Sequence, residues 1–208
     1  MIQSFFIITL SFVLWAVIHS WLADFRLKAR FRQRWGDALF RWYRLGYNFF
    51  AALSFVPVYL AYSLLPDKVL WQPGPLATWL MLGIQAVGLV GLTVAVFATD
   101  VGVYTGLAQL RPSYNPDAPP EPMRLSGLYC LVRHPIYFFS LFIVWFAAPV
   151  TVNRMVIATL FTLYFYYGGK HEELGLREEF GVQYDRYRQH VPMLVPRPGR
   201  KRCPEVLP

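Results

Sequence analysis

The stretch Gly127-Leu-Tyr-Cys-Leu-Val-Arg133-His134-Pro135-Ile-Tyr137 joins a polar connection to a long apolar run. Proline favours the first position of a helix, because the N–H that it lacks would have no helical partner there. The free N–H groups of such a helix start carry partial positive charge, here beside Arg133 and His134. The stretch therefore predicts a helix that begins at Pro135 and favours an anion. A basic anchor at a membrane edge is the alternative that this stretch alone leaves open.

The composition predicts an integral membrane protein. Of the 208 residues, 56% are hydrophobic, 18% are aromatic and only 15% are charged, which is not the composition of a soluble domain. Apolar stretches suited to membrane helices cover residues 2–23, 45–65, 76–98, 134–150 and 152–168. We therefore predict an all-α integral membrane protein with five transmembrane helices and a cytosolic amphipathic C-terminal helix, forming a single domain over residues 1–208.

Positive charge gathers in alternate connections between these predicted spans. The connections 24–44, 99–133 and 169–208 contain 18 of the 20 Lys and Arg residues. Cytoplasmic connections of membrane proteins are enriched in these residues, so the pattern predicts that the N-terminus lies outside and that Arg133 faces the cytoplasm. The same pattern explains the net charge of +8 by contact with membrane lipids, and we expect no nucleic-acid partner. We predict a bacterial inner-membrane location.

Two further patterns concern helix packing. Gly83, Gly88 and Gly91 give the third predicted span a thin side, against which another helix can pack closely. After Gly168-Gly169 the sequence becomes polar, and we expect a separate C-terminal helix there. The helix has an apolar stripe at helical spacing, formed by Leu176, Phe180, Tyr184 and Tyr187.

The acidic pair Glu172-Glu173 lies at the start of this predicted C-terminal helix, on the same membrane side as Arg133. Pairing with Arg177 on a solvated helix face is the alternative explanation for these carboxylates. The four histidines show no HxxH or HxxxH spacing and the two cysteines show no paired spacing, so we predict no metal site. Glycine-rich nucleotide-binding motifs and a GxSxG nucleophile motif are also missing from the sequence.

The motifs together resemble a known family. The sequence contains, in this order, Arg133-His134-Pro135-x-Tyr137, Glu172-Glu173-x-x-Leu176-x-x-x-Phe180-Gly181-x-x-Tyr184-x-x-Tyr187 and Val191-Pro192. Over about residues 126–196 this resembles the C-terminal core of the isoprenylcysteine carboxyl methyltransferase and phospholipid methyltransferase superfamily. More weakly, His19-Ser20, Gly106-Leu-Ala-Gln109-Leu and the hairpin that contains Pro149 resemble the methanethiol S-methyltransferase and denitrification-associated branch.

The resemblance implies an enzyme that transfers a methyl group from the cofactor S-adenosylmethionine. Its acceptor would be an amphiphilic or volatile small molecule, either a small thiol or a lipid-like prenylcysteine carboxylate or phospholipid amine. The cofactor-binding core would cover about residues 99–196. The implied cofactor-binding residues are His134, Pro135, Tyr137 and Glu173, and the implied catalytic residues are Arg133 and Glu172.

Several alternatives stay open at this stage. A non-catalytic accessory membrane protein that retains the methyltransferase fold is the second hypothesis. If the acceptor needs a base, His134, His19 or a glutamate could serve. The oligomeric state is left open. One departure from the family pattern is Phe139, which stands where family members commonly have a small residue.

Overall fold

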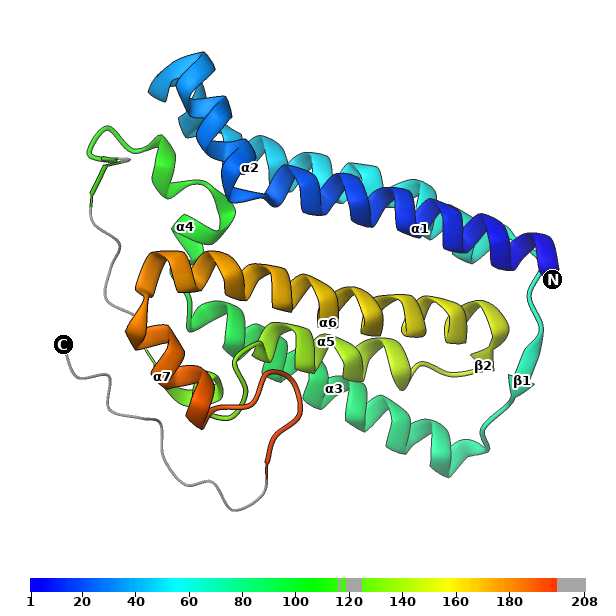
Figure 1. The fold of residues 1–208 in the computed structure, drawn as a ribbon. Coiled ribbons are helices and arrows are strands. Elements are labelled where there is room, and N and C mark those ends of the chain that lie inside the picture. The colour runs from blue at the N-terminus through cyan, green and yellow to red at the C-terminus, as the bar shows by residue number, and fades with distance from the viewer. Residues whose placement is uncertain (116, 119–124, 198–208) are drawn as a thin grey trace. The chain divides into compact units, whose positions relative to one another are not determined.

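The computed structural model describes residues 1–115, 117–118 and 125–197. The chain divides into two compact units, which are described one at a time. Unit one comprises residues 1–68, 100–119 and 151–160, and unit two comprises residues 69–99, 120–150 and 161–208. The described elements are almost all helical (Figure 1), as the sequence predicts.

Two long helices dominate unit one. Helix α1 (Ile2–Ala23) and helix α2 (Phe25–Leu64) lie side by side (Figure 1). Between them the Asp24 carboxylate accepts hydrogen bonds from the first free N–H groups of α2, at 2.9 and 3.1 Å, and so caps that helix. The predicted connection 24–44 is helical after Asp24, because α2 runs without a loop from Phe25 into the second predicted span. The helix is interrupted at Gly36, whose φ of 74° is readily adopted only by glycine.

A short polar segment of unit one docks on α2. It contains helix α4 (Val101–Thr105) and the 3₁₀ helix η1 (Ala108–Leu110). Gly106 joins them with a φ of 95°, and a Cβ atom on it would lie 2.6 Å from the backbone nitrogen of Leu45. The amide of Asn48 donates hydrogen bonds to two carbonyls at the end of α4, at 3.1 and 2.9 Å. This part of the predicted polar connection is therefore ordered by α2.

In unit two, helix α3 (Pro75–Phe97) packs along helix α5 (Pro135–Trp145) (Figure 1). A Cβ atom on Gly91 would lie 2.3 Å from the ring of Phe139, and one on Gly88 would lie 2.8 Å from Cβ of Phe142. The predicted thin side is thus confirmed at these two glycines, whereas a Cβ atom on Gly83 would meet no other described helix within 4 Å. The ring of Phe139 fills the space that Gly91 leaves on α3.

The remaining elements complete the fold. They are two short paired strands, β1 (Val69–Trp71) and β2 (Val150–Thr151), the 3₁₀ helix η2 (Gly127–Cys130), and helices α6 (Val152–Phe180) and α7 (Val182–His190). The predicted helix end at Gly168-Gly169 is wrong, because α6 continues to Phe180. The break occurs instead at Gly181, with a φ of 52°.

The predicted apolar stripe does gather in the fold, although it is divided between α6 and α7. Tyr184, Tyr187 and Val191 form a buried cluster, and Leu176 and Phe180 pack against it. The turn at Gly181 therefore folds α7 back so that both helices contribute to one core.

Among the residues that the structure describes, three helices, α1, α2 and α3, are long and apolar enough to cross a membrane. The helix predicted over 134–150 is shorter, because α5 ends at Trp145 after 11 residues. A helix of that length rises about 16 Å, roughly half of the hydrocarbon thickness. The helix predicted over 152–168 is longer, since α6 extends to Phe180.

We expect Gly91→Ala to destabilise the protein by about 1–3 kcal/mol, because the added methyl group must displace the Phe139 ring from a close-packed helix contact. The matched control is Gly83→Ala on the same helix, which adds a methyl group where no atom lies within 4 Å and should be neutral or stabilising. Thermal unfolding in detergent compares the two variants. Equal melting temperatures for both would contradict the packing described here.

Candidate functional site

The predicted motif adopts the predicted helix start. Pro135 occupies the first turn of α5 and His134 is the residue before it. The backbone N–H groups of Arg133 and His134 donate to the carbonyls of Pro192 and Met193, at 2.9 and 3.1 Å. The segment that follows α7 is thereby fixed against the beginning of α5.

A buried ion pair joins the two halves of the motif. Nε and Nη2 of Arg133 lie 2.8 and 2.7 Å from the same oxygen, Oε1, of Glu173. The two side chains are only 11% and 8% exposed. Nη1 of Arg133 donates further hydrogen bonds to the carbonyls of Arg188 and Val191. The guanidinium therefore holds Glu173 and the end of α7 at once.

His134 lies between the two glutamates. Its Nε2 is 3.2 Å from Oε1 of Glu173 and its Nδ1 is 3.5 Å from Oε2 of Glu172. A Cβ atom on Gly169 would lie 3.4 Å from the His134 ring and 2.6 Å from the terminal methyl group of Met193. Gly169 thus allows the imidazole and Met193 to approach α6 closely, a function that the sequence did not reveal.

The charges of this cluster stabilise one another. Burial alone would lower the pKa of His134, but hydrogen bonds to Glu172 and Glu173 outweigh it and raise that pKa. Burial alone would raise the pKa of Glu173, but hydrogen bonds from His134 and Arg133 outweigh it and lower that pKa. Both groups are therefore held more firmly in their charged forms than in water.

Three aromatic rings stack beside the ion pair. The rings of His134 and Tyr137 are 5.2 Å apart and 8° from parallel, and those of Tyr137 and Phe165 are 4.8 Å apart and 9° from parallel. The Tyr137 hydroxyl donates to Oε2 of Glu172 at 2.9 Å. Phe165 is the site residue that the sequence analysis missed. Its position four residues before Gly169, one helical turn away, is the signal that could have found it.

The cluster leaves polar atoms available to a ligand. Oε2 of Glu173 receives no hydrogen bond from any described residue, and Arg188 Nε lies 3.7 Å from it. The hydroxyl of Tyr184, a residue only 1% exposed, also has no hydrogen-bond partner among the described residues. Burying an unpaired hydroxyl costs about 1–3 kcal/mol, so an added polar partner would be favourable. These atoms and the aromatic faces suit a nucleoside with hydroxyl and charged groups.

The structure brings five of the six predicted site side chains into one cluster in unit two, and Pro135 starts the helix beside them. The five are Arg133, His134, Tyr137, Glu172 and Glu173. Their roles stay predictions. Pairing of the glutamates with Arg177 is not observed among the described ion pairs, since Arg177 pairs with Asp185 at 2.8 Å.

His19, the other candidate base, belongs to unit one. Its Nε2 lies 2.7 Å from the hydroxyl of Tyr47, and its ring stacks on Trp15 with the ring centres 4.8 Å apart. These contacts give His19 a structural environment within the α1–α2 pair.

We expect the stability of the protein to fall as the pH rises above about 6.5. The folded-state pKa of His134 is raised above 6.5, so its contribution is complete below the unfolded-state pKa and is lost as the pH rises through the folded-state pKa. Melting temperatures measured between pH 6 and 9 should show this loss in the wild type but not in His134→Gln. His190→Gln, at an exposed position on α7, is the matched control. An identical pH dependence in His134→Gln and the wild type would refute the assignment.

Known proteins with similar sequences are methanethiol S-methyltransferases. Methanethiol S-methyltransferase 2 of Bradyrhizobium diazoefficiens is 28% identical over 186 residues, which are 88% of this chain and 70% of the relative. Methanethiol S-methyltransferase 1 of the same organism is 30% identical over 185 residues, 88% of this chain and 64% of the relative. The Pseudomonas deceptionensis enzyme is 33% identical over 140 residues, 61% of this chain and 52% of the relative.

No protein-family model and no solved structure matches the chain. The similarity nevertheless extends over most of the chain in the two Bradyrhizobium relatives. The chain is therefore similar in sequence to methanethiol S-methyltransferases, in agreement with the resemblance to the methanethiol S-methyltransferase branch that its motifs show.

Proposed function

We propose that the chain is an integral-membrane methyltransferase that uses S-adenosylmethionine to methylate a small thiol. The observation that carries this proposal is the buried cluster of Arg133, His134 and Glu173 beside a stack of aromatic rings. Relatives named methanethiol S-methyltransferase support the methyl transfer and make methanethiol the first acceptor to test.

The residues of the cluster suit the groups of this cofactor. Oε2 of Glu173 would accept hydrogen bonds from ribose hydroxyls, since it receives none from the described protein residues. Tyr137 lies between His134 and Phe165 in the stack, so Phe165 at its end would offer the aromatic surface for the adenine. Pro135, in the first turn of α5, lies next to His134 in the chain and would border the same site. When bound, S-adenosylmethionine supplies an electrophilic methyl group on a sulfonium.

The protein would chiefly align the two reactants and accept the proton of the thiol. Fixing two reactants in line can remove about 7–11 kcal/mol of a barrier, and the hydrogen-bonded cluster provides rigid side chains for that purpose. Arg133 acts here by holding Glu173 in one orientation. A thiol reacts as its thiolate, so we assign Glu172 as the proton acceptor. Its side chain is half exposed, and Tyr137 orients it.

We further propose that the chain crosses a bacterial inner membrane five times, with the N-terminus outside and the cluster facing the cytoplasm. The gathering of 18 of the 20 Lys and Arg residues in alternate connections supports this orientation. In this arrangement the fourth crossing consists of α5 together with the non-helical residues 146–149, and the turn near Thr151 lies outside.

The methyl transfer is tested by following labelled methyl groups. We expect membranes that contain the protein to pass the label from S-adenosylmethionine to methanethiol, so that it appears in the volatile fraction as dimethyl sulfide. Glu173→Gln should weaken binding of S-adenosylhomocysteine, measured by calorimetry, by about 10- to 100-fold, because it removes a charged hydrogen-bond acceptor. Glu178→Gln, at an exposed position on the same helix, should leave binding unchanged.

The outcomes separate the alternatives. Label in the lipid or base-labile ester fraction would identify a lipid-like acceptor in place of the thiol. Folded protein that binds no S-adenosylhomocysteine would favour the accessory membrane protein that retains this fold without turnover. Full binding by Glu173→Gln would remove this carboxylate from the cofactor site.

The topology predicts which reporter fusions are active. Alkaline phosphatase, which is active only outside the cytoplasm, should be active when fused after Gln72 or Thr151 and inactive when fused after Tyr114. Green fluorescent protein at the same positions should give the opposite pattern. Lack of phosphatase activity after Thr151, with activity after Gln72, would remove the fourth and fifth crossings.

A further inference from the structure

The cation of the sequence motif is already engaged by the protein. The Arg133 guanidinium donates through Nε to Oε1 of Glu173 and through Nη1 to the carbonyls of Arg188 and Val191, and its Nη2 lies 2.7 Å from the same oxygen of Glu173. All three of its nitrogens are therefore in contact with protein oxygens. An anionic ligand would have to compete with a buried carboxylate for this group, which is unfavourable because breaking a buried ion pair leaves a charge without its partner.

A second arginine beside the same carboxylate is not engaged in this way. The Arg188 guanidinium makes no hydrogen bond to any residue that the structure describes. Its Nε lies 3.7 Å from Oε2 of Glu173, and its Nη1 lies 3.8 Å from Oδ1 of Asp185. Both distances exceed those of a good hydrogen bond. Asp185 is held by Arg177 at 2.8 Å.

Arg188 is also accessible. Its side chain is 38% exposed, compared with 11% for Arg133. The guanidinium groups of Arg133 and Arg188 thus both lie beside the Glu173 carboxylate. One carboxylate neutralises only one of them, so an anionic ligand could pair with the other. The Arg188–Glu173 pair is long, at 3.7 Å, and its arginine is 38% exposed, so it contributes little to stability. Redirecting Arg188 towards a ligand therefore costs the fold little.

We propose that Arg188 binds the carboxylate of the methionine portion of S-adenosylmethionine. This inference rests on the proposed function and adds a binding residue that the motif does not contain. The planar guanidinium presents paired N–H donors that match a carboxylate. Oε2 of Glu173, 3.7 Å away, is the neighbouring acceptor for the hydroxyl groups of the same ligand. A cofactor analogue without the carboxylate should therefore bind without the help of Arg188.

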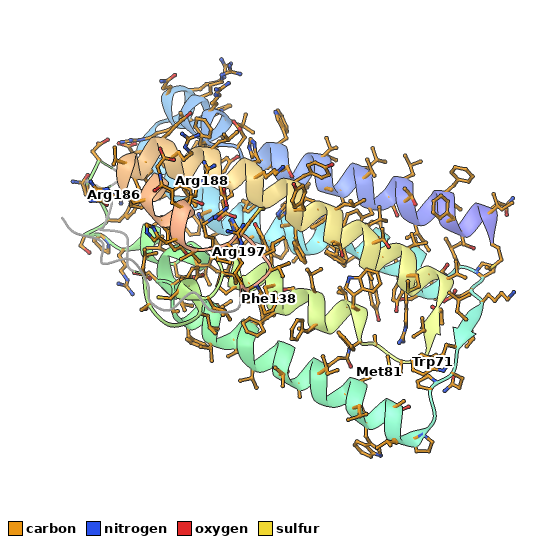
Figure 2. The ribbon with its side chains drawn as sticks, turned by 60° about the horizontal axis from the view of Figure 1, so that its bottom comes forward. Trp71, Met81, Phe138, Arg186, Arg188 and Arg197 are labelled. Carbon is orange, nitrogen blue, oxygen red and sulfur yellow. The ribbon has the colours of Figure 1, made fainter. Side chains whose placement is uncertain are left out.

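Helix α7 offers a matched control. Arg186 lies two residues before Arg188, which places it about 200° around the helix. It is exposed, and both arginines are labelled on α7 in Figure 2. Arg186→Gln and Arg188→Gln therefore remove the same charge from the same helix, but only the second removes it beside Glu173.

The experiment compares S-adenosylmethionine with its decarboxylated analogue, which differs only in the missing carboxylate. Calorimetry without an acceptor measures both affinities for the full-length protein in detergent. We expect Arg188→Gln to weaken binding of S-adenosylmethionine about 10- to 100-fold and to leave binding of the analogue within about twofold. Arg188→Lys should restore part of the difference, and Arg186→Gln should change neither affinity.

Each result has one meaning. If the folded wild type binds neither ligand, the proposed function itself fails. If it binds S-adenosylmethionine and Arg188→Gln binds equally well, only the role of Arg188 is overturned. If Arg188→Gln weakens both ligands by the same factor, Arg188 acts on the fold or the adenosine, and the carboxylate assignment is again overturned. Unchanged melting temperatures confirm that the variants are folded.

Discussion

The ion pair between Arg133 and Glu173 is the interaction on which unit two depends. It connects the segment before α5 to the second half of α6, and through Nη1 of Arg133 it also holds the end of α7. A buried pair of this kind is costly to desolvate, and it is stable only when its remaining donors and acceptors are satisfied. Arg133 meets that requirement with two backbone carbonyls. Glu173 meets it only in part, since one of its oxygens is shared by Arg133 and His134 and the other receives no hydrogen bond from the described residues.

This asymmetry connects the stability of the fold to its proposed chemistry. Oε1 of Glu173, which contacts Arg133 and His134, fixes the orientation of the carboxylate, and Oε2 receives no hydrogen bond from the described residues. A ligand that donates hydrogen bonds there would complete a network that the protein leaves incomplete. Preorganised groups of this kind need no rearrangement at the moment of binding, which is an advantage for alignment.

The sequence predicts the helix start at Pro135, the apolar stripe of the C-terminal region, and the close approach of a helix at Gly88 and Gly91. Each of these depends on local geometry or helical spacing. The conformation at a glycine is harder to predict from the sequence. Gly36 interrupts a helix and Gly168-Gly169 does not, because glycine tolerates both conformations and packing decides between them. The extent of α5 was also overestimated, since apolar residues continue beyond the last helical hydrogen bond at Phe146.

In the site, too, features set by local sequence could be predicted, and features set by tertiary packing could not. Residues within the motifs were identified in advance, but Phe165 and Arg188 were not, because their relevance arises only when α5, α6 and α7 come together. Gly169 explains how this happens. It is the position at which α6 changes from apolar to polar, and its missing side chain admits the His134 ring and Met193.

The same boundary bears on the proposed acceptor. Phe165, on which the ring of Tyr137 from α5 stacks, lies one turn before Gly169, on the apolar side, and the two glutamates lie one turn after it, on the polar side. A small thiol dissolves in an apolar phase but must lose its proton to react. An acceptor that arrives along the apolar part of α6 would meet the aromatic rings before it meets Glu172. The order of residues along one helix thus matches the order in which such an acceptor is bound and then deprotonated.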